Sequence, residues 1–217
     1  MNSIRHIQAD DLESMTIWDD FIDRSGLPSY MYSAWRTVLE SQFNRRVLQL
    51  FAFDVANRPC GFCMGYDDGL NFYSLRYGFY AADPETSDLL LREVEQYCRS
   101  YGLKEALITS GDRPAFPSSL PVFEKANIYL PLYYDNEADM WEAVSKKARN
   151  IKRAEKEGVT VSQDWAHIGA FQVLHAVHSD ERGMIVRPLD FFEELKRLFQ
   201  DKMTLLSALK DGQVIAG

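Results

Sequence analysis

SAWRTVLESQFNRRVLQLFAFDVANRPCG, residues 33–61, decides the fold, because residues 189–217, LDFFEELKRLFQDKMTLLSALKDGQVIAG, follow the same pattern. Five identical residues stand 156 positions apart without a gap: Leu39 and Leu195, Phe43 and Phe199, Leu50 and Leu206, Ala52 and Ala208, and Gly61 and Gly217. Each copy predicts a helix, a strand, a polar turn and a new strand. A repeat of so long a period indicates two similar domains rather than a solenoid. We therefore expect a tandem duplication whose second copy is incomplete.

The composition indicates a globular protein. The chain has 217 residues, of which 46% are hydrophobic and 26% are charged, and its net charge is -8. That acidic balance argues against coating of nucleic acid, because proteins that neutralise many phosphates carry a basic surplus. The chain has no apolar run of about 18 residues and no apolar N-terminal stretch of the kind that a secretion signal needs. A cytoplasmic protein without a transmembrane segment is expected.

The first half of the chain predicts helices around an antiparallel sheet. Asp10 and Glu13 have the form of a capping box before a first helix, and Ser33 precedes a second. Strands are predicted at residues 47–54, 60–66 and 70–77, then a helix that starts at Pro84 and stops at Gly102, and a strand at 105–109. A further strand is expected at 128–132.

The segment from Trp141 to Gly158 is the most distinctive part of the sequence. It holds six basic and three acidic residues, a local surplus in an acidic chain. At helical spacing, one side carries Trp141, Val144, Ala148 and Ile151, and the other carries Arg149, Lys152, Arg153 and Lys156. Guanidinium groups match phosphate oxygens, so this face could hold a diphosphate. A solvated face with internal ion pairs is the competing interpretation.

Residues 141–159 have the sequence WEAVSKKARNIKRAEKEGV and resemble the signature of the Fem-type (FemAB-like) aminoacyltransferases. Members of that family are similar to two fused Gcn5-related N-acyltransferase (GNAT) domains. The order of predicted elements is also that of the GNAT fold. The resemblance implies an α/β (α+β) fold, with a mixed, mostly antiparallel sheet flanked by helices. It implies a first GNAT-like domain at 1–137, a basic linking helix at 138–158 and the N-terminal half of a second domain at 159–217.

The resemblance also implies a function, which is transfer of an acyl or aminoacyl group to an amine of a cell-envelope precursor. The donor would be acyl-CoA or aminoacyl-tRNA, with no permanently bound cofactor. Expected partners are a nucleotide-linked or lipid-linked cell-wall precursor, tRNA and the membrane periphery. A non-catalytic module that binds or scaffolds an anionic glycan, nucleotide sugar or tRNA is the alternative.

No catalytic residue is assigned from the sequence. The first domain has no Gln or Arg followed by the glycine-rich spacing that cradles a coenzyme pyrophosphate, and the resemblance places donor binding on later strands of the second domain. We therefore expect no complete active site in this chain. Besides the basic face, the candidates for substrate binding are Arg36 and Arg182, with Arg76 as a further phosphate or carboxylate contact and Glu181 as a guess at a base.

We expect no metal site. Cys60 and Cys63 have the spacing of a metal pair, but residues three apart on a strand should point to opposite faces. His175 and His178 stand one helical turn apart, yet no further residue completes a ligand set. Partly exposed helix histidines are the simpler interpretation.

Overall fold

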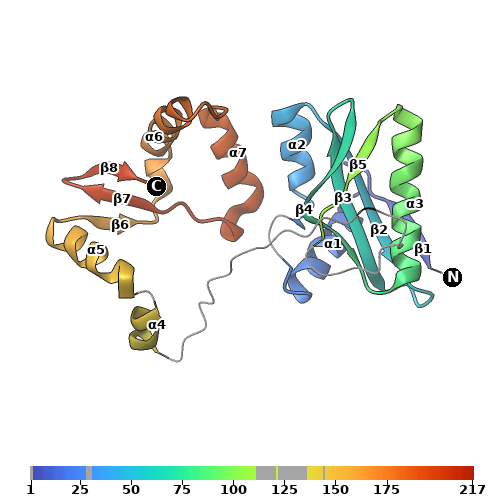
Figure 1. The fold of residues 1–217 in the computed structure, drawn as a ribbon, viewed down its shortest axis with the longest axis horizontal. Coiled ribbons are helices and arrows are strands. Elements are labelled where there is room, and N and C mark those ends of the chain that lie inside the picture. The colour runs from blue at the N-terminus through green and yellow to red at the C-terminus, as the bar shows by residue number, and fades with distance from the viewer. Residues whose placement is uncertain (1, 28–30, 111–120, 122–135, 144) are drawn as a thin grey trace. The chain divides into compact units, whose positions relative to one another are not determined.

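The computed structural model describes residues 2–27, 31–110, 121, 136–143 and 145–217. It divides the chain into two compact units, Met1–Val122 (unit 1) and Phe123–Gly217 (unit 2), and each has its own sheet (Figure 1). The three-part division expected from the sequence, with a separate linking helix, stays a prediction. None of the described helices is long and apolar enough to cross a membrane.

Unit 1 is built on a five-stranded sheet in the order β1-β2-β3-β4-β5. Its strands are β1 (Ser3–His6), β2 (Arg46–Phe53), β3 (Pro59–Asp67), β4 (Asn71–Ala81) and β5 (Glu105–Leu107). Neighbouring strands run antiparallel from β1 to β4, whereas β5 lies parallel to β4. The sequence analysis predicted β2 to β5 but missed β1, whose four residues carry too short a pattern to indicate a strand.

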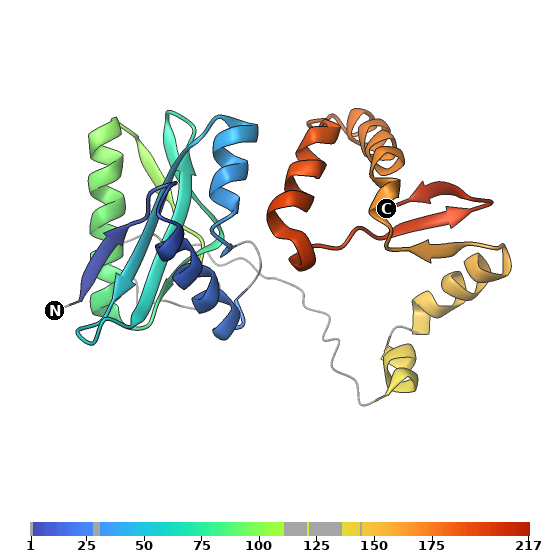
Figure 2. The same cartoon turned by 180° about the vertical axis from the view of Figure 1, so that it is seen from behind.

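Helices cover both faces of this sheet, as Figures 1 and 2 show. They are α1 (Leu12–Arg24), α2 (Trp35–Phe43) and α3 (Pro84–Tyr101). Side chains alternate along β2, so Leu48 and Leu50 pack with Leu90 of α3, whereas Phe51 packs with Trp18 of α1. Two apolar layers therefore form, one on each side. The predicted mixed, mostly antiparallel sheet flanked by helices is confirmed.

The helix ends agree with the sequence in part. The capping box predicted at Asp10 is wrong by one residue, because the carboxylate of Asp11 accepts the Ser14 N–H at 3.0 Å. Ser33 caps no helix; its backbone N–H and hydroxyl both donate to the carboxylate of Asp19. The stop at Gly102 is confirmed, since this residue ends α3 with a left-handed backbone at φ 66°.

The prediction that Cys60 and Cys63 point to opposite faces of the sheet is wrong, because β3 contains a bulge. Ala52 pairs with Gly61 and Phe53 pairs with Pro59, so Cys60 is an extra residue in β3. The bulge turns Cys60 toward α3, where its sulfur lies 3.6 Å from the Thr86 hydroxyl. Cys60 and Cys63 therefore share the α3 side of the sheet instead of facing opposite sides. Both are free, buried thiols, and burial raises the pKa of each.

Unit 2 holds a three-stranded antiparallel sheet in the order β6-β7-β8. Its elements are α4 (Glu137–Ala143), α5 (Ser145–Lys156), β6 (Thr160–Ser162), α6 (Ile168–Glu181), α7 (Leu189–Phe199), β7 (Ser207–Lys210) and β8 (Gln213–Ala216). The segment from Trp141 to Gly158, predicted to be helical, is described as α4 and α5 on either side of residue 144. The strand predicted at 128–132 lies outside the described residues.

The two units repeat each other in the order of their elements and in the position of a bulge. Ile4 pairs with Ala52 in unit 1, and Val161 pairs with Ala208 in unit 2. In both units the middle strand then meets a bulge, between Ala52 and Phe53 and between Ala208 and Leu209. The order β6-α6-α7-β7-β8 thus matches β1-α1-α2-β2-β3. The helix, strand, turn and strand predicted for both copies are present.

Candidate functional site

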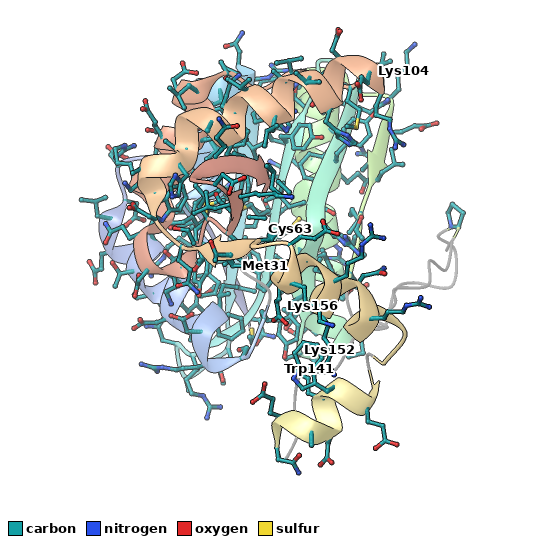
Figure 3. All side chains as sticks on the ribbon, turned by 90° about the vertical axis from the view of Figure 1, so that its left-hand side faces the viewer. Met31, Cys63, Lys104, Trp141, Lys152 and Lys156 are labelled. Atoms are coloured by element: carbon teal, nitrogen blue, oxygen red, sulfur yellow. The ribbon has the colours of Figure 1, made fainter. Side chains whose placement is uncertain are left out.

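The basic residues predicted to bind substrate lie on the exposed surface of α5. Arg149, Lys152, Arg153 and Lys156 are all exposed, and Figure 3 labels Lys152 and Lys156. Arg153 forms an ion pair with Glu157 at 2.9 Å, one helical turn away. Such an exposed pair contributes little to stability. The helix ends at Gly158, whose φ is 79°.

The apolar side expected for this helix is less buried than predicted. Ile151 is 39% exposed, and the indole N–H of Trp141 donates to Glu137 at 3.0 Å within α4. Of the apolar residues predicted on this side, Ile151 is thus exposed, whereas Val144 and Ala148 lie outside the described side chains. An accessible basic helix is a suitable surface for an anionic ligand.

Arg182 lies at the end of α6, in a different setting from the α5 face. It is exposed, and its backbone N–H caps the helix by donating to Asp180 and Ser179 carbonyl oxygens. Gly183 follows with φ 62° and turns the chain. Glu181, the residue suggested as a base, is exposed.

The two helix histidines differ in their surroundings. His178 is exposed, whereas His175 is half-buried beside Phe171 and Phe192. The Nε2 atom of His175 accepts the Arg187 backbone N–H at 3.3 Å. Across the described residues, no group of three or more His, Cys, Asp or Glu side chains is arranged to hold a metal ion.

Arg36 is the one predicted binding residue that lies in a defined pocket. It is buried in α2, donates through Nε to Glu40 at 2.9 Å and through Nη1 to the Ile7 carbonyl oxygen at 2.5 Å. Its charge is therefore already compensated by a carboxylate. The pocket around it has a volume of about 320 Å³ and is lined by residues of β1, α2, β2 and α3.

An ion pair between exposed Arg46 and buried Asp67 lies at one end of this pocket. Arg46 donates to both oxygens of Asp67, with distances of 2.8 to 3.3 Å, and Asp67 is only 3% exposed. The Tyr97 hydroxyl donates to the same carboxylate at 2.6 Å. Burial alone would raise the pKa of Asp67, but hydrogen bonds from Arg46, Tyr97 and the Gly69 N–H outweigh it and lower the pKa below its ordinary value.

The same network raises the pKa of Tyr97. Burial is the main cause, and the bond to the Asp67 carboxylate adds to it. Tyr97 therefore stays protonated and acts as a hydrogen-bond donor. The guanidinium of Arg46 also lies 4.1 Å from the centre of the Tyr101 ring, in a cation–π contact.

β4 is irregular just beyond Tyr73, the last residue of this strand that pairs with β5. Gly65 of β3 pairs with Ser74, but Cys63 pairs with Phe79, so β4 bulges outward between those partners. Tyr77 has φ 59°, a conformation that non-glycine residues seldom adopt and that often marks functional sites. Exposed Arg76 lies in the bulge, its guanidinium 5.4 Å from the Tyr77 ring.

The N-terminus of α3 is closed to an incoming phosphate. Asp83 caps it by accepting the Thr86 N–H at 2.8 Å, and Pro84 has no N–H to offer. Glu85 adds a negative charge to the first turn. This agrees with the absence of a glycine-rich phosphate loop from the first domain, since an anion there would meet carboxylates.

Sequence reasoning found Arg36 but missed the groups around it. Arg46, Asp67 and Tyr97 come from three separate elements. Gln49 lies in a strand whose other residues are mostly apolar. The available signal was Gln49 itself, a polar residue between Leu48 and Leu50. A polar side chain within a buried strand requires a partner or a role.

Three solved structures illustrate what the chain is similar to. One is a probable acetyltransferase, with 16% identity and a TM-score of 0.35 over 61% of this chain and 99% of that one. A second is a GNAT family acetyltransferase of Staphylococcus aureus, with 15% identity and a TM-score of 0.38 over 58% and 98%. A third is a ribosomal-protein-alanine N-acetyltransferase from Brucella melitensis, with 10% identity and a TM-score of 0.41 over 61% and 100%.

No family model matches the chain, and no curated protein matches it. Identity and TM-score are low for all three structures. The functional proposal therefore rests on the geometry of the chain itself.

Proposed function

We propose that this chain is part of a Fem-like N-acyltransferase with two GNAT-like units, which transfers an acyl or aminoacyl group to an amine of a cell-envelope precursor. One observation carries the proposal: the β-α-α-β-β order occurs in both units, and the middle strand meets a bulge at the same place in each, between Ala52 and Phe53 and between Ala208 and Leu209. Tandem units of this order are what the resemblance of the basic segment implies. The repeat and the basic helix thus support the same family.

The expected reaction needs no covalent enzyme intermediate. The nitrogen of the acceptor amine attacks the carbonyl carbon of a bound acyl ester or thioester, a C–N bond forms, and the C–O or C–S bond breaks. The leaving ribose hydroxyl or thiol takes up the proton that the amine loses. The protein contributes orientation and stabilisation of the oxyanion.

Unit 1 is proposed not to bind the donor. The α3 N-terminus, where a phosphate would need free N–H groups, is occupied by Asp83 and followed by Glu85. A coenzyme pyrophosphate there would face carboxylates. We therefore assign donor binding to unit 2, with acyl-CoA or aminoacyl-tRNA as the donor.

The exposed face of α5 is proposed to hold the diphosphate of a nucleotide-linked or lipid-linked acceptor. Arg149 and Arg153 lie one helical turn apart, as do Lys152 and Lys156. Arg153 is engaged with Glu157, and a diphosphate would compete with this weak exposed pair. Anionic lipid at the membrane periphery or tRNA phosphates would meet the same charges.

The proposal is tested by offering donors and acceptor to the purified full-length protein of which this chain is proposed to be part. Acetyl-CoA or radiolabelled glycyl-tRNA is mixed with a nucleotide-linked muropeptide, and the acceptor is analysed by mass spectrometry. A product heavier by the acyl group, absent without protein, supports transfer. Binding of the muropeptide without any product from either donor would instead support the non-catalytic alternative.

A further inference from the structure

The edge of the unit 1 sheet is only half covered. β2 runs from Arg46 to Phe53, but β1 pairs with its second half alone, from Leu50 to Phe53. The last link is the Ile7 N–H, which donates to the Gln49 carbonyl oxygen at 2.9 Å. Beyond it, no described strand covers residues 46–48 on this side. The pocket of about 320 Å³ lies at this place.

The backbone of β2 presents hydrogen-bonding groups to the pocket. The Gln49 carbonyl oxygen points toward β1, and backbone groups of an antiparallel strand alternate in direction. The N–H and C=O of Val47 therefore point to the same open side, whereas those of Leu48 face β3, where Leu48 pairs with Gly65. An uncovered edge of this kind can accept an added strand.

The side-chain amide of Gln49 also has unpaired hydrogen-bonding groups in the described structure. Gln49 is 1% exposed, and its Oε1 and Nε2 are both buried with no hydrogen-bond partner among the described residues. A buried amide offers one acceptor and two donors, and leaving them unpaired is unfavourable. Another amide group satisfies such a side chain best, because it supplies a donor and an acceptor together.

The charges that line the pocket argue against a simple anion site. Arg36 is bound to Glu40, and Arg46 is bound to Asp67, so each guanidinium already has its carboxylate. Arg46 is nevertheless half exposed, at 50% of its side chain, and stacks on Tyr101 at the pocket rim. It is placed to meet a partly solvated carboxylate at one end of a longer ligand.

We propose that this pocket binds a short extended peptide with a free C-terminal carboxylate, which continues the line of β1 along β2. Like β1, such a peptide would run antiparallel to β2, so its C-terminus would point toward Arg46. Its main chain would pair with Val47, and one of its amides would pair with Gln49. This site does not depend on acyl transfer.

The test uses NMR titration of the isotope-labelled full chain with trialanine, in parallel with trialanine amide and N-methylacetamide. Trialanine is expected to shift the backbone amides of Ile7, Val47 and Gln49 saturably, with an affinity about tenfold higher than that of the C-terminal amide. Binding of N-methylacetamide as tightly as trialanine would overturn strand pairing. Absence of saturable shifts at about 10 mM trialanine would overturn the site.

Two variants link the binding to the named groups. Gln49→Leu removes a buried amide that has no hydrogen bond among the described residues, so the protein should fold and bind trialanine about tenfold more weakly. Val47→Pro removes one outward N–H, which an edge strand tolerates, and should weaken binding similarly. Arg99→Ala, outside the pocket on α3, is the control and should bind as the parent does. Unchanged affinity in either folded pocket variant would contradict the proposal.

Discussion

The guanidinium of Arg46 holds the buried carboxylate of Asp67 with three hydrogen bonds, and so ties the first residue of β2 to the last residue of β3. The Tyr97 hydroxyl joins α3 to the same carboxylate. One carboxylate therefore connects two strands and a helix. This connection makes unit 1 sensitive to the charge state of Asp67.

Because of this connection, we expect the free energy of unfolding to decrease at acid pH. Because the folded-state pKa of Asp67 is lowered, its stabilisation is fully present above the ordinary aspartate pKa of about 3.9. It is lost as the pH falls through the lower folded-state value. Asp67→Asn should lower the free energy of unfolding by about 1.5–3 kcal/mol at neutral pH. On acidification, the free energy of unfolding of this variant should decrease less than that of the parent. Urea unfolding from neutral to about pH 2 checks this, and an equal pH dependence in both proteins would contradict it.

The bulge of β4 should not tolerate a side chain at Gly78. A Cβ at this position would lie 2.5 Å from the Met64 carbonyl oxygen and 2.7 Å from backbone atoms of Leu75. Gly78→Ala should therefore destabilise the protein by about 1–3 kcal/mol. Gly169→Ala is the matched control, because nothing lies within 4 Å of its added Cβ in α6. It should be neutral or stabilise by up to about 1 kcal/mol. Thermal unfolding of both variants distinguishes them.

The strand pairing predicts one engineered disulfide in each unit. Ile4 lies opposite Ala52, and Val161 lies opposite Ala208, at the short distance between facing residues of an antiparallel pair. The double variants Ile4→Cys/Ala52→Cys and Val161→Cys/Ala208→Cys should both form a disulfide under mild oxidation, as peptide mass mapping would show. A bond in the first pair alone would show that β6 and β7 do not pair in this register.

The basic face of α5 predicts a binding defect without a folding defect. Arg149→Ala/Arg153→Ala alters two exposed side chains, so stability should change by about 0.5 kcal/mol or less per site. Affinity for a nucleotide-linked muropeptide should fall, since charge-assisted contacts contribute about 1.5–3 kcal/mol each before compensation. Calorimetry at fixed salt, with tRNA as a second ligand, measures the effect.

The control for this prediction keeps the change in charge and moves it to another helix. Arg92→Ala/Arg99→Ala removes two exposed arginines from α3 and should leave both affinities unchanged. If the two double variants weakened binding equally, the effect would reflect net charge, and α5 would be a solvated face.

Local sequence patterns were sufficient to predict most elements of unit 1. The hairpin at Asp67-Asp68-Gly69 and the helix from Pro84 to Gly102 follow from turn chemistry, helix caps and apolar spacing, which act between near neighbours in the chain. The repeat of residues 33–61 at 189–217 was also visible in the sequence, because similar packing selects similar residues at equal positions. Strand β1 was missed, since four residues carry too short a pattern.

The tertiary structure alone decided the bulge at Cys60 and the pocket around Gln49. A bulge depends on how two strands pair, so the spacing of Cys60 and Cys63 could not show that both face α3. The partners Arg46 and Asp67 stand 21 residues apart, and Tyr97 stands 30 residues beyond Asp67. Each looks like an ordinary surface residue in its own segment. Their shared hydrogen bonds exist only because the pairing of β2 with β3, and the packing of α3 on that sheet, bring distant side chains together.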